Sequence, residues 1–257
     1  MLLILVAIVA FAAAIMTFFS GFGLGTILTP FFCLFFSVQE AIALTAIVHF
    51  ANNIFKFSLL KKHIDYNVAL PFAFTAVLMS FAGAEVLNYI SFQKYEYTYD
   101  LLGITAAITP VKIVVALLMI VFVVVELIPE WSFKVSGRIS HLIGGMFSGF
   151  FGGLSGNQGA LRSMFLLKAG LSKESYIATG VLIACIVDIS RLSVYTKNWN
   201  ALNLDSQLSL MSVAVIAALG GSLLGKKYIQ KITMKSMQRL IVGFLSCIAL
   251  LLGSGIL

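Results

Sequence analysis

The sequence predicts an all-α polytopic membrane protein built from two inverted repeats of about five helices each. Of its 257 residues, 60% are hydrophobic and only 11% are charged, whereas a soluble domain carries roughly 25% charged residues. Several apolar segments have the length of about 20 residues that a helix needs to cross a bilayer. Strand-like alternation of apolar and polar residues is absent, which argues against a transmembrane barrel.

The first repeat, residues 1–130, begins with an apolar segment over residues 2–20. The stretch FSGFGLGTILTP at 19–30 interrupts it with three glycines and a proline. Glycine costs a helix about 1 kcal/mol and proline about 3 kcal/mol. We therefore expect the first helix to break here and a short helix of about a dozen residues to start near Gly25. Three longer helices should follow, over 38–60, 67–90 and 111–128.

The second repeat, residues 131–257, follows the same order. Its break is GGLSGNQGALRS, and a short helix should start near Gly159. Each short helix leads into an acidic turn, SVQEA in the first half and LSKES in the second. At one constant shift, Gly25 aligns with Gly159, Glu40 with Glu174 and Thr45 with Thr179. The three helices that complete this repeat are expected over 173–195, 207–225 and 240–256.

The loop charges predict the topology. If each short helix crosses the membrane, every repeat has five crossings, an odd number that inverts the second half relative to the first; if the short helices are re-entrant instead, the side assignments stay the same. Lysine and arginine concentrate in cytoplasmic loops; here they gather in 61–66, 129–138, 168–173 and 226–239. The opposite loops, 91–109 and 196–206, hold one lysine each. We expect a multi-pass protein of the cell membrane (the inner membrane in a bacterium) with both termini outside.

The two breaks predict a binding site. Irregular backbone at membrane depth is tolerated where it is buried or lines a cavity, and matched breaks in inverted halves mark the sites of transporters. A helix N-terminus offers N–H groups and partial positive charge to an anion, and glycine allows close approach. The alternative is that the glycines only permit close helix crossing. The predicted binding residues are Gly21, Gly23, Gly25, Thr26, Ser155, Gly156, Asn157, Gln158, Gly159 and Arg162.

Arg162 indicates that the ligand is negatively charged. An arginine at membrane depth costs about 2.5–3.5 kcal/mol on insertion scales, so it should face protein, water or a ligand. Its planar fork matches an oxyanion such as a sulfonate or carboxylate. The alternative is a structural ion pair with Asp188 or Glu174.

Further polar residues share one face of the segments 38–60 and 173–195. Lys56 and Arg191 are candidate cationic gates, although snorkelling would also explain Lys56 and Asp188 would neutralise Arg191. His49 is a candidate proton carrier for coupling, or makes only an interhelical hydrogen bond. The gating or coupling candidates are His49, Asn52, Asn53, Lys56, Asp188 and Arg191.

The paired breaks GFGLGTILTP and GGLSGNQGALRS, each followed by a short helix and an acidic turn, resemble the TauE/SafE family of membrane permeases. The similarity extends over nearly the whole chain, including the KKHIDY loop and the FAGAE stretch. It implies a transporter that exports small sulfur-containing anions such as sulfite or sulfoacetate. Transport would proceed by alternating access around a central site formed by the two broken helices. The residues alone imply only an anion.

Two other functions compete with this interpretation. The same breaks could line an anion channel. The GLSG stretch at 153–156 is similar to the nucleophile motif of rhomboid proteases, but all three histidines precede Ser155, whereas rhomboids use one on a later helix. We therefore expect no enzyme, no catalytic residue, no metal and no cofactor. The expected partners are a small anion and the lipid bilayer, with a homo-oligomer as an option; nucleic acid is not expected, since the net charge of +7 resides in loops.

Overall fold

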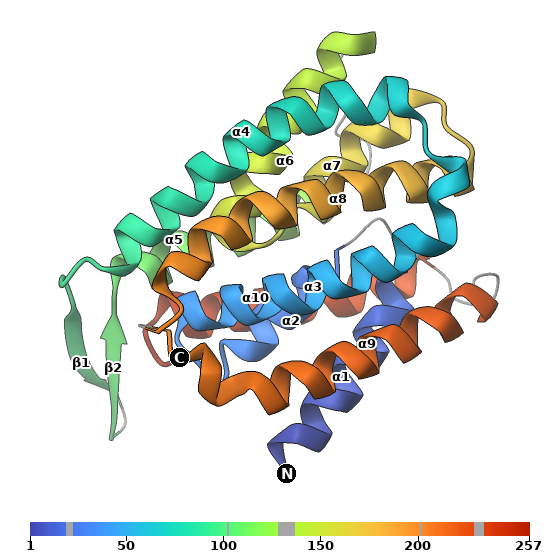
Figure 1. Cartoon of the computed structure of the whole chain (residues 1–257). Coiled ribbons are helices and arrows are strands. Elements are labelled where there is room, and N and C mark those ends of the chain that lie inside the picture. Colours follow the sequence, from blue (N-terminus) through green and yellow to red (C-terminus); the bar gives the residue numbers. More distant parts are fainter. Residues whose placement is uncertain (19–22, 102, 128–136, 201, 229–233) are drawn as a thin grey trace.

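The computed structural model describes residues 1–257 apart from 19–22, 102, 128–136, 201 and 229–233. The described residues form an all-helical bundle of ten α-helices with one small β-hairpin (Figure 1). The helices of the first half are α1 (Leu2–Thr17), α2 (Gly25–Phe32), α3 (Val38–Leu60), α4 (Tyr66–Ser91) and α5 (Pro110–Leu127). Those of the second half are α6 (Gly137–Ser155), α7 (Gly159–Leu166), α8 (Lys173–Tyr195), α9 (Leu208–Tyr228) and α10 (Met234–Gly253).

Both predicted breaks separate a longer helix from a short one. The short helices begin at Gly25 and Gly159, as predicted. Each has eight residues rather than about a dozen, because the chain soon turns to start the next helix. Ser37 caps α3 in a capping box with Glu40, and Ser172 caps α8. The acidic turns of the two halves are thus helix N-terminal signals.

A β-hairpin in the loop between α4 and α5 was not predicted. Its strands, β1 (Tyr97–Leu101) and β2 (Ile104–Ile108), pair antiparallel. Gly103 adopts a φ of 83° in the turn, where glycine is the favoured residue. The hydroxyl of Tyr99 donates to the carbonyl of Ser254 at 2.7 Å. The hairpin is therefore attached to the chain end that follows α10.

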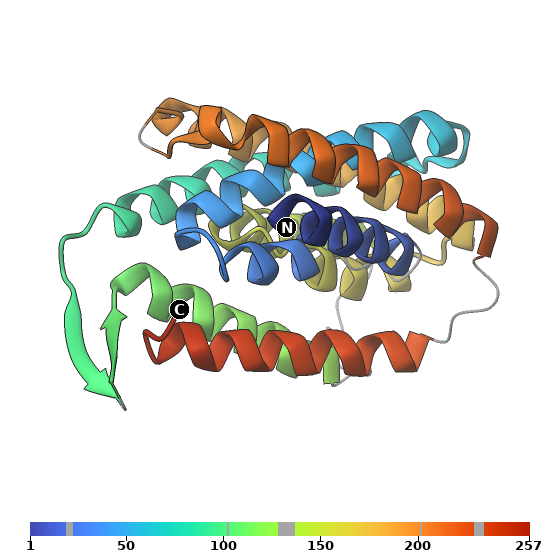
Figure 2. The same ribbon diagram turned by 90° about the horizontal axis from the view of Figure 1, so that it is seen from below.

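Helix contacts pair the elements of the two halves. Helix α1 packs against α9, and α6 packs against α4. Helix α3 packs against α8, and α5 lies beside α10 along one face of the molecule (Figure 2). The α4–α6 crossing is very close: a Cβ on Gly145, Gly149 or Gly153 would overlap backbone carbonyls of α4. Small residues allow this close approach of helices in a membrane.

The outer surface and the helix lengths suit a membrane. Among the described residues, four helical segments are long and apolar enough to cross a bilayer: Val38–His63, Tyr66–Ser91, Lys173–Tyr195 and Leu204–Lys227. The helical stretches Leu2–Thr17, Pro110–Val125 and Ile241–Gly253 are also apolar but shorter. Large apolar side chains such as Leu70, Phe74 and Leu78 are more than half exposed, as expected for a surface that faces lipid.

Three helix ends that carry lysines gather at one end of the molecule (Figures 1 and 2). Lys61 and Lys62 follow α3, Lys173 begins α8, and Lys226 and Lys227 end α9. These helix ends lie together at the right of Figures 1 and 2, and the hairpin and the C-terminus lie at the opposite end. Lys134 and Lys231 fall outside the described residues.

Candidate functional site

The two breaks touch at the centre of the bundle. A Cβ on Gly25 would lie 2.8 Å from the carbonyl oxygen of Gly156, so the backbones of the two breaks are in direct contact. Gly156 has a φ of 79°, which residues with a side chain rarely adopt. A Cβ there would also lie 3.1 Å from Nη1 of Arg191. Both glycines are therefore required by the local structure, whatever the ligand.

The start of α2 is more closed than the sequence suggested. The N–H groups of Thr26 and Ile27 donate to the carbonyls of Gly23 and Leu24 at 3.0 and 3.2 Å. A tight first turn thus uses donors that we expected to face an anion. Among the predicted glycines of this break, Gly23 lines a cavity, and Gly21 lies outside the described residues.

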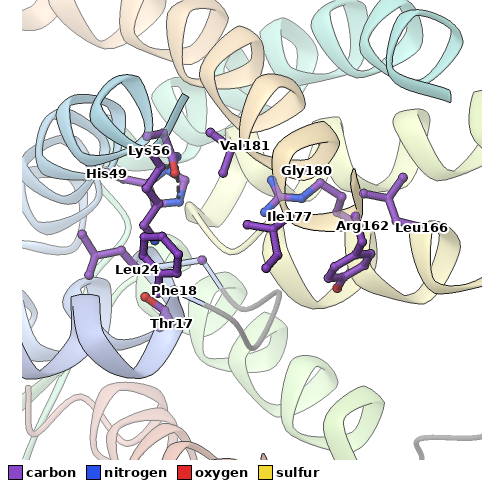
Figure 3. Close-up of a pocket in the computed structure, with 13 residues that line it drawn as sticks. Thr17, Phe18, Leu24, His49, Lys56, Arg162, Leu166, Ile177, Gly180 and Val181 are labelled. Atoms are coloured by element: carbon purple, nitrogen blue, oxygen red, sulfur yellow. Dashed lines mark hydrogen bonds between the residues drawn. The ribbon is translucent and has the colours of Figure 1, made fainter. Parts of the chain in front are cut away.

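The cavity lies between the two halves of the chain. Its lining comes from α1 with the residues that follow it, and from α3, α7 and α8 (Figure 3). Its volume is about 30 Å³, and a cavity needs roughly 10–15 Å³ to hold one water molecule. It therefore has room for about two waters, so only a small ligand fits without movement of the walls.

Arg162 of α7 lines this cavity and is 7% exposed. Its Nη1 donates to the amide oxygen of Gln158 at 3.4 Å. On the α8 side, Gly180 leaves space for the guanidinium, since a Cβ there would lie 3.4 Å from Nε. Within the described part of the chain, neither Asp188 nor Glu174 forms an ion pair with Arg162. The predicted structural pair is therefore not present.

Lys56 of α3 is the second cation of the cavity. It is 4% exposed, and its ammonium lies 4.9 Å from the ring centroid of Phe18, a cation–π distance. Figure 3 shows Lys56 beside His49 and Phe18 on one side of the cavity and Arg162 on the other. Burial toward the cavity argues against the snorkelling interpretation of Lys56.

Asp188 of α8 has a complete set of partners next to the cavity. Its Oδ1 accepts from Nε of Arg191 at 2.9 Å and from Nε2 of Gln158 at 3.2 Å. Its Oδ2 lies 2.7 Å from Nδ1 of His49 and accepts from Nδ2 of Asn53 at 3.2 Å. Arg191 is thus the cation that neutralises Asp188, as the second interpretation of its spacing predicted.

The remaining candidates have structural partners or lie away from the cavity lining. The amide oxygen of Asn52 accepts from the Ser222 hydroxyl at 2.7 Å, which joins α3 to α9. The hydroxyl of Ser155 donates to the Phe151 carbonyl of its own helix at 3.0 Å, so it is not arranged as a nucleophile beside a base. Asn157 is buried, and neither polar atom of its side chain has a partner among the described residues.

Sequence reasoning missed several residues of the cavity wall, among them Phe18, Tyr176 and Gly180. Phe18 directly precedes the first break, and Tyr176 and Gly180 lie one helical turn apart on α8. Their spacing places the α8 pair on one face. Phe18 is apolar and Gly180 has no side chain, so neither gave a chemical signal in the sequence, and Tyr176 was not among the predicted residues.

The electrostatics of the site favour an anion. The buried side chains in and beside the cavity include three basic groups, Lys56, Arg162 and Arg191, and one acidic group, Asp188. Because Arg191 is paired with Asp188, the two basic side chains on the cavity, Lys56 and Arg162, have no carboxylate partner among the described residues. A buried, uncompensated charge is costly, and an anion bound between Lys56 and Arg162 would remove that cost.

Comparison with known proteins agrees with this chemistry. The family model described as Sulfite exporter TauE/SafE matches residues 6–252. Neither the curated proteins nor the solved structures contain a significant match.

Proposed function

The chain belongs to the TauE/SafE sulfite exporter family, and we propose that it moves small sulfur-containing anions across the cell membrane by alternating access. The family consists of membrane transporters rather than enzymes. Sulfite is the preferred candidate, because the cavity of about 30 Å³ suits a small oxyanion better than the longer sulfoacetate. Export is the direction that the family description indicates.

The observation that carries this proposal is the pair of buried cations on the cavity. Arg162 and Lys56 reach it from α7 and α3, one from each half of the chain. A guanidinium provides two parallel donors for the oxygens of an oxyanion, and an ammonium provides a compact charge. An anion held between them would be bound by both halves at once.

The helix pairing supports alternating access. If α1–α5 of the first half match α6–α10 of the second in order, the α1–α9 contact is the counterpart of the α6–α4 contact. The α3–α8 and α5–α10 contacts each join a helix to its own counterpart. Exchange of the halves leaves this set of contacts unchanged, as expected for two repeats related by a pseudo-two-fold axis. In such folds one repeat rocks against the other around the binding site. We propose domain limits of 1–130 and 131–257 for the two inverted repeats.

A ligand screen of the purified protein tests the proposal. Thermal unfolding would be followed with sulfite, sulfoacetate, taurine, sulfate and chloride. A ligand at 100 times its Kd stabilises the folded state by about 2.7 kcal/mol, so sulfite should raise the unfolding temperature measurably and chloride should not. Absence of a shift with every sulfur anion would contradict the proposal. Flux into proteoliposomes that saturates with sulfite concentration would then favour a carrier over a channel.

A further inference from the structure

The histidine on the cavity wall has a defined hydrogen-bonding state. His49 is 2% exposed and lies between the cavity and Asp188. Its Nδ1 is 2.7 Å from Oδ2 of Asp188. Because an ionised carboxylate only accepts hydrogen bonds, Nδ1 carries the hydrogen. In the neutral ring, Nε2 is then the nitrogen with a free electron pair.

That second nitrogen, Nε2, faces the first break. A Cβ on Gly23 would lie 3.0 Å from it, and Gly23 lines the same cavity. Nδ2 of Asn53 lies 3.3 Å from Nε2 and 3.0 Å from Nδ1. Asn53 also reaches Oδ2 of Asp188 at 3.2 Å. Asn53 therefore keeps an acceptor if Nε2 takes up a proton.

The charges around the ring make its protonation depend on the ligand. His49 is surrounded by Asp188 and Arg191 of α8, Arg162 of α7 and Lys56 of its own helix. Asp188 is already paired with Arg191, so a proton on His49 in the empty site adds positive charge beside Lys56 and Arg162, which have no carboxylate partner among the described residues. A bound anion reverses the sign of this interaction. Anion and proton therefore favour each other's binding, and the effect is reciprocal.

We propose that His49 is a proton-binding site that fills together with the anion site, so that the protein carries a proton with each anion. This inference rests on the proposed function of the cavity. The proton moves from water to Nε2; Nε2–H then donates to an oxygen of the anion while Nδ1–H continues to donate to Asp188. A carrier that binds both ligands before it changes conformation moves them in the same direction.

The ring state of His49 is directly measurable, because the chain has only three histidines. In the double variant His63→Gln, His141→Gln, the nitrogen NMR signals of ¹⁵N-histidine-labelled protein come from His49 alone. At pH 7.5, sulfite should convert the Nε2 signal from that of an unprotonated ring nitrogen to that of an N–H. An unchanged ring state in a sample shown to bind sulfite would overturn the inference.

A titration with a matched control gives a second test. His49→Asn keeps an amide donor for Asp188 and removes Nε2. Sulfite itself changes protonation state with pH, and this changes the affinity of both proteins by the same factor. The ratio of wild-type to variant affinity is therefore free of that effect. That ratio should rise about tenfold from pH 8 to pH 6, within the usual range of coupling between sites. The exposed His63→Gln should behave as wild type.

The two tests separate this inference from the proposed function. If wild-type protein binds sulfite and the affinity ratio is constant with pH, the proton site is wrong and the anion site stands. If sulfite binds to neither wild-type protein nor the double variant, the proposed function itself is wrong. Should His49→Asn fail to fold, the NMR measurement decides alone, since it leaves His49 in place.

Discussion

Replacing Arg162 by glutamine should abolish much of the anion affinity and leave the fold intact. Arg162 is 7% exposed and faces the cavity with Gln158 as its hydrogen-bond partner. A hydrogen bond to a charged group contributes roughly 1.5–3 kcal/mol, and each 1.4 kcal/mol is about a tenfold change in Kd. We therefore expect Arg162→Gln to weaken sulfite binding by about one to two orders of magnitude. Arg162→Lys keeps the charge without the fork, so its loss should be smaller.

The stability of the ligand-free protein distinguishes an anion-binding role of Arg162 from a structural role. Within the described residues no carboxylate is paired with Arg162, so Arg162→Gln leaves none unpaired and should unfold near the wild-type temperature. Arg191→Gln, in contrast, leaves Asp188 buried without its cation, and breaking such a pair costs about 3–5 kcal/mol. Adding Asp188→Asn should recover part of that loss.

Calorimetric titration with sulfite and thermal unfolding would measure both effects. The exposed Arg138→Gln is the matched control and should change neither quantity. Wild-type affinity in Arg162→Gln would refute the assignment of Arg162 to the anion. A large loss of ligand-free stability in that variant would show that Arg162 has a structural role instead.

Three further predictions follow from the same geometry. Lys56→Gln should weaken sulfite binding about tenfold, whereas unchanged calorimetric affinity would assign Lys56 to the fold alone. Gly25→Ala places a Cβ 2.8 Å from a facing carbonyl and should lower stability by about 1–3 kcal/mol; Gly243→Ala, with open space around it, should not, and equal melting temperatures would contradict the contact. In a cysteine-free background, an impermeant thiol reagent applied to intact cells should label Tyr95→Cys but not Lys62→Cys; the reverse pattern would contradict the proposed orientation.

The helix positions were largely predictable, because each start carries a local signal. Gly25 and Gly159 begin the short helices where the glycine-rich breaks end, and Ser37 and Ser172 cap the helices that follow. Local signals did not suffice in the loop between α4 and α5. There the hairpin depends on contacts with the distant chain end, such as that from Tyr99 to Ser254.

The sequence predicted which charged residues belong to the candidate site, but not which of them pair with one another. Spacing placed Asp188 and Arg191 on one helical face, three residues apart, and the structure pairs them. The same sequence left Arg162 as an alternative partner of Asp188, because spacing on one helix says nothing about where another helix lies. His49 also bonds to Asp188, a contact between the two halves that only the packing of α3 against α8 creates.

Glycine served two purposes that the sequence could not separate. Gly25 and Gly156 bring the two breaks into contact, while Gly149 and Gly153 bring α6 against the backbone of α4. Gly25, Gly149 and Gly153 require a residue without a side chain because another backbone packs against them. Gly156 is required for a second reason, its positive φ. The partner of each glycine is distant in sequence, so only the structure identifies it.

The most direct measurement is the position of a bound anion in an experimental structure. Selenite, a close analogue of sulfite, has an electron-rich atom that anomalous scattering locates. The peak should lie in the cavity between α3 and α7, within hydrogen-bond distance of the Arg162 guanidinium and close to the Lys56 ammonium. A selenite peak elsewhere in the bundle, with this cavity empty, would contradict the assignment of the anion site to these two cations.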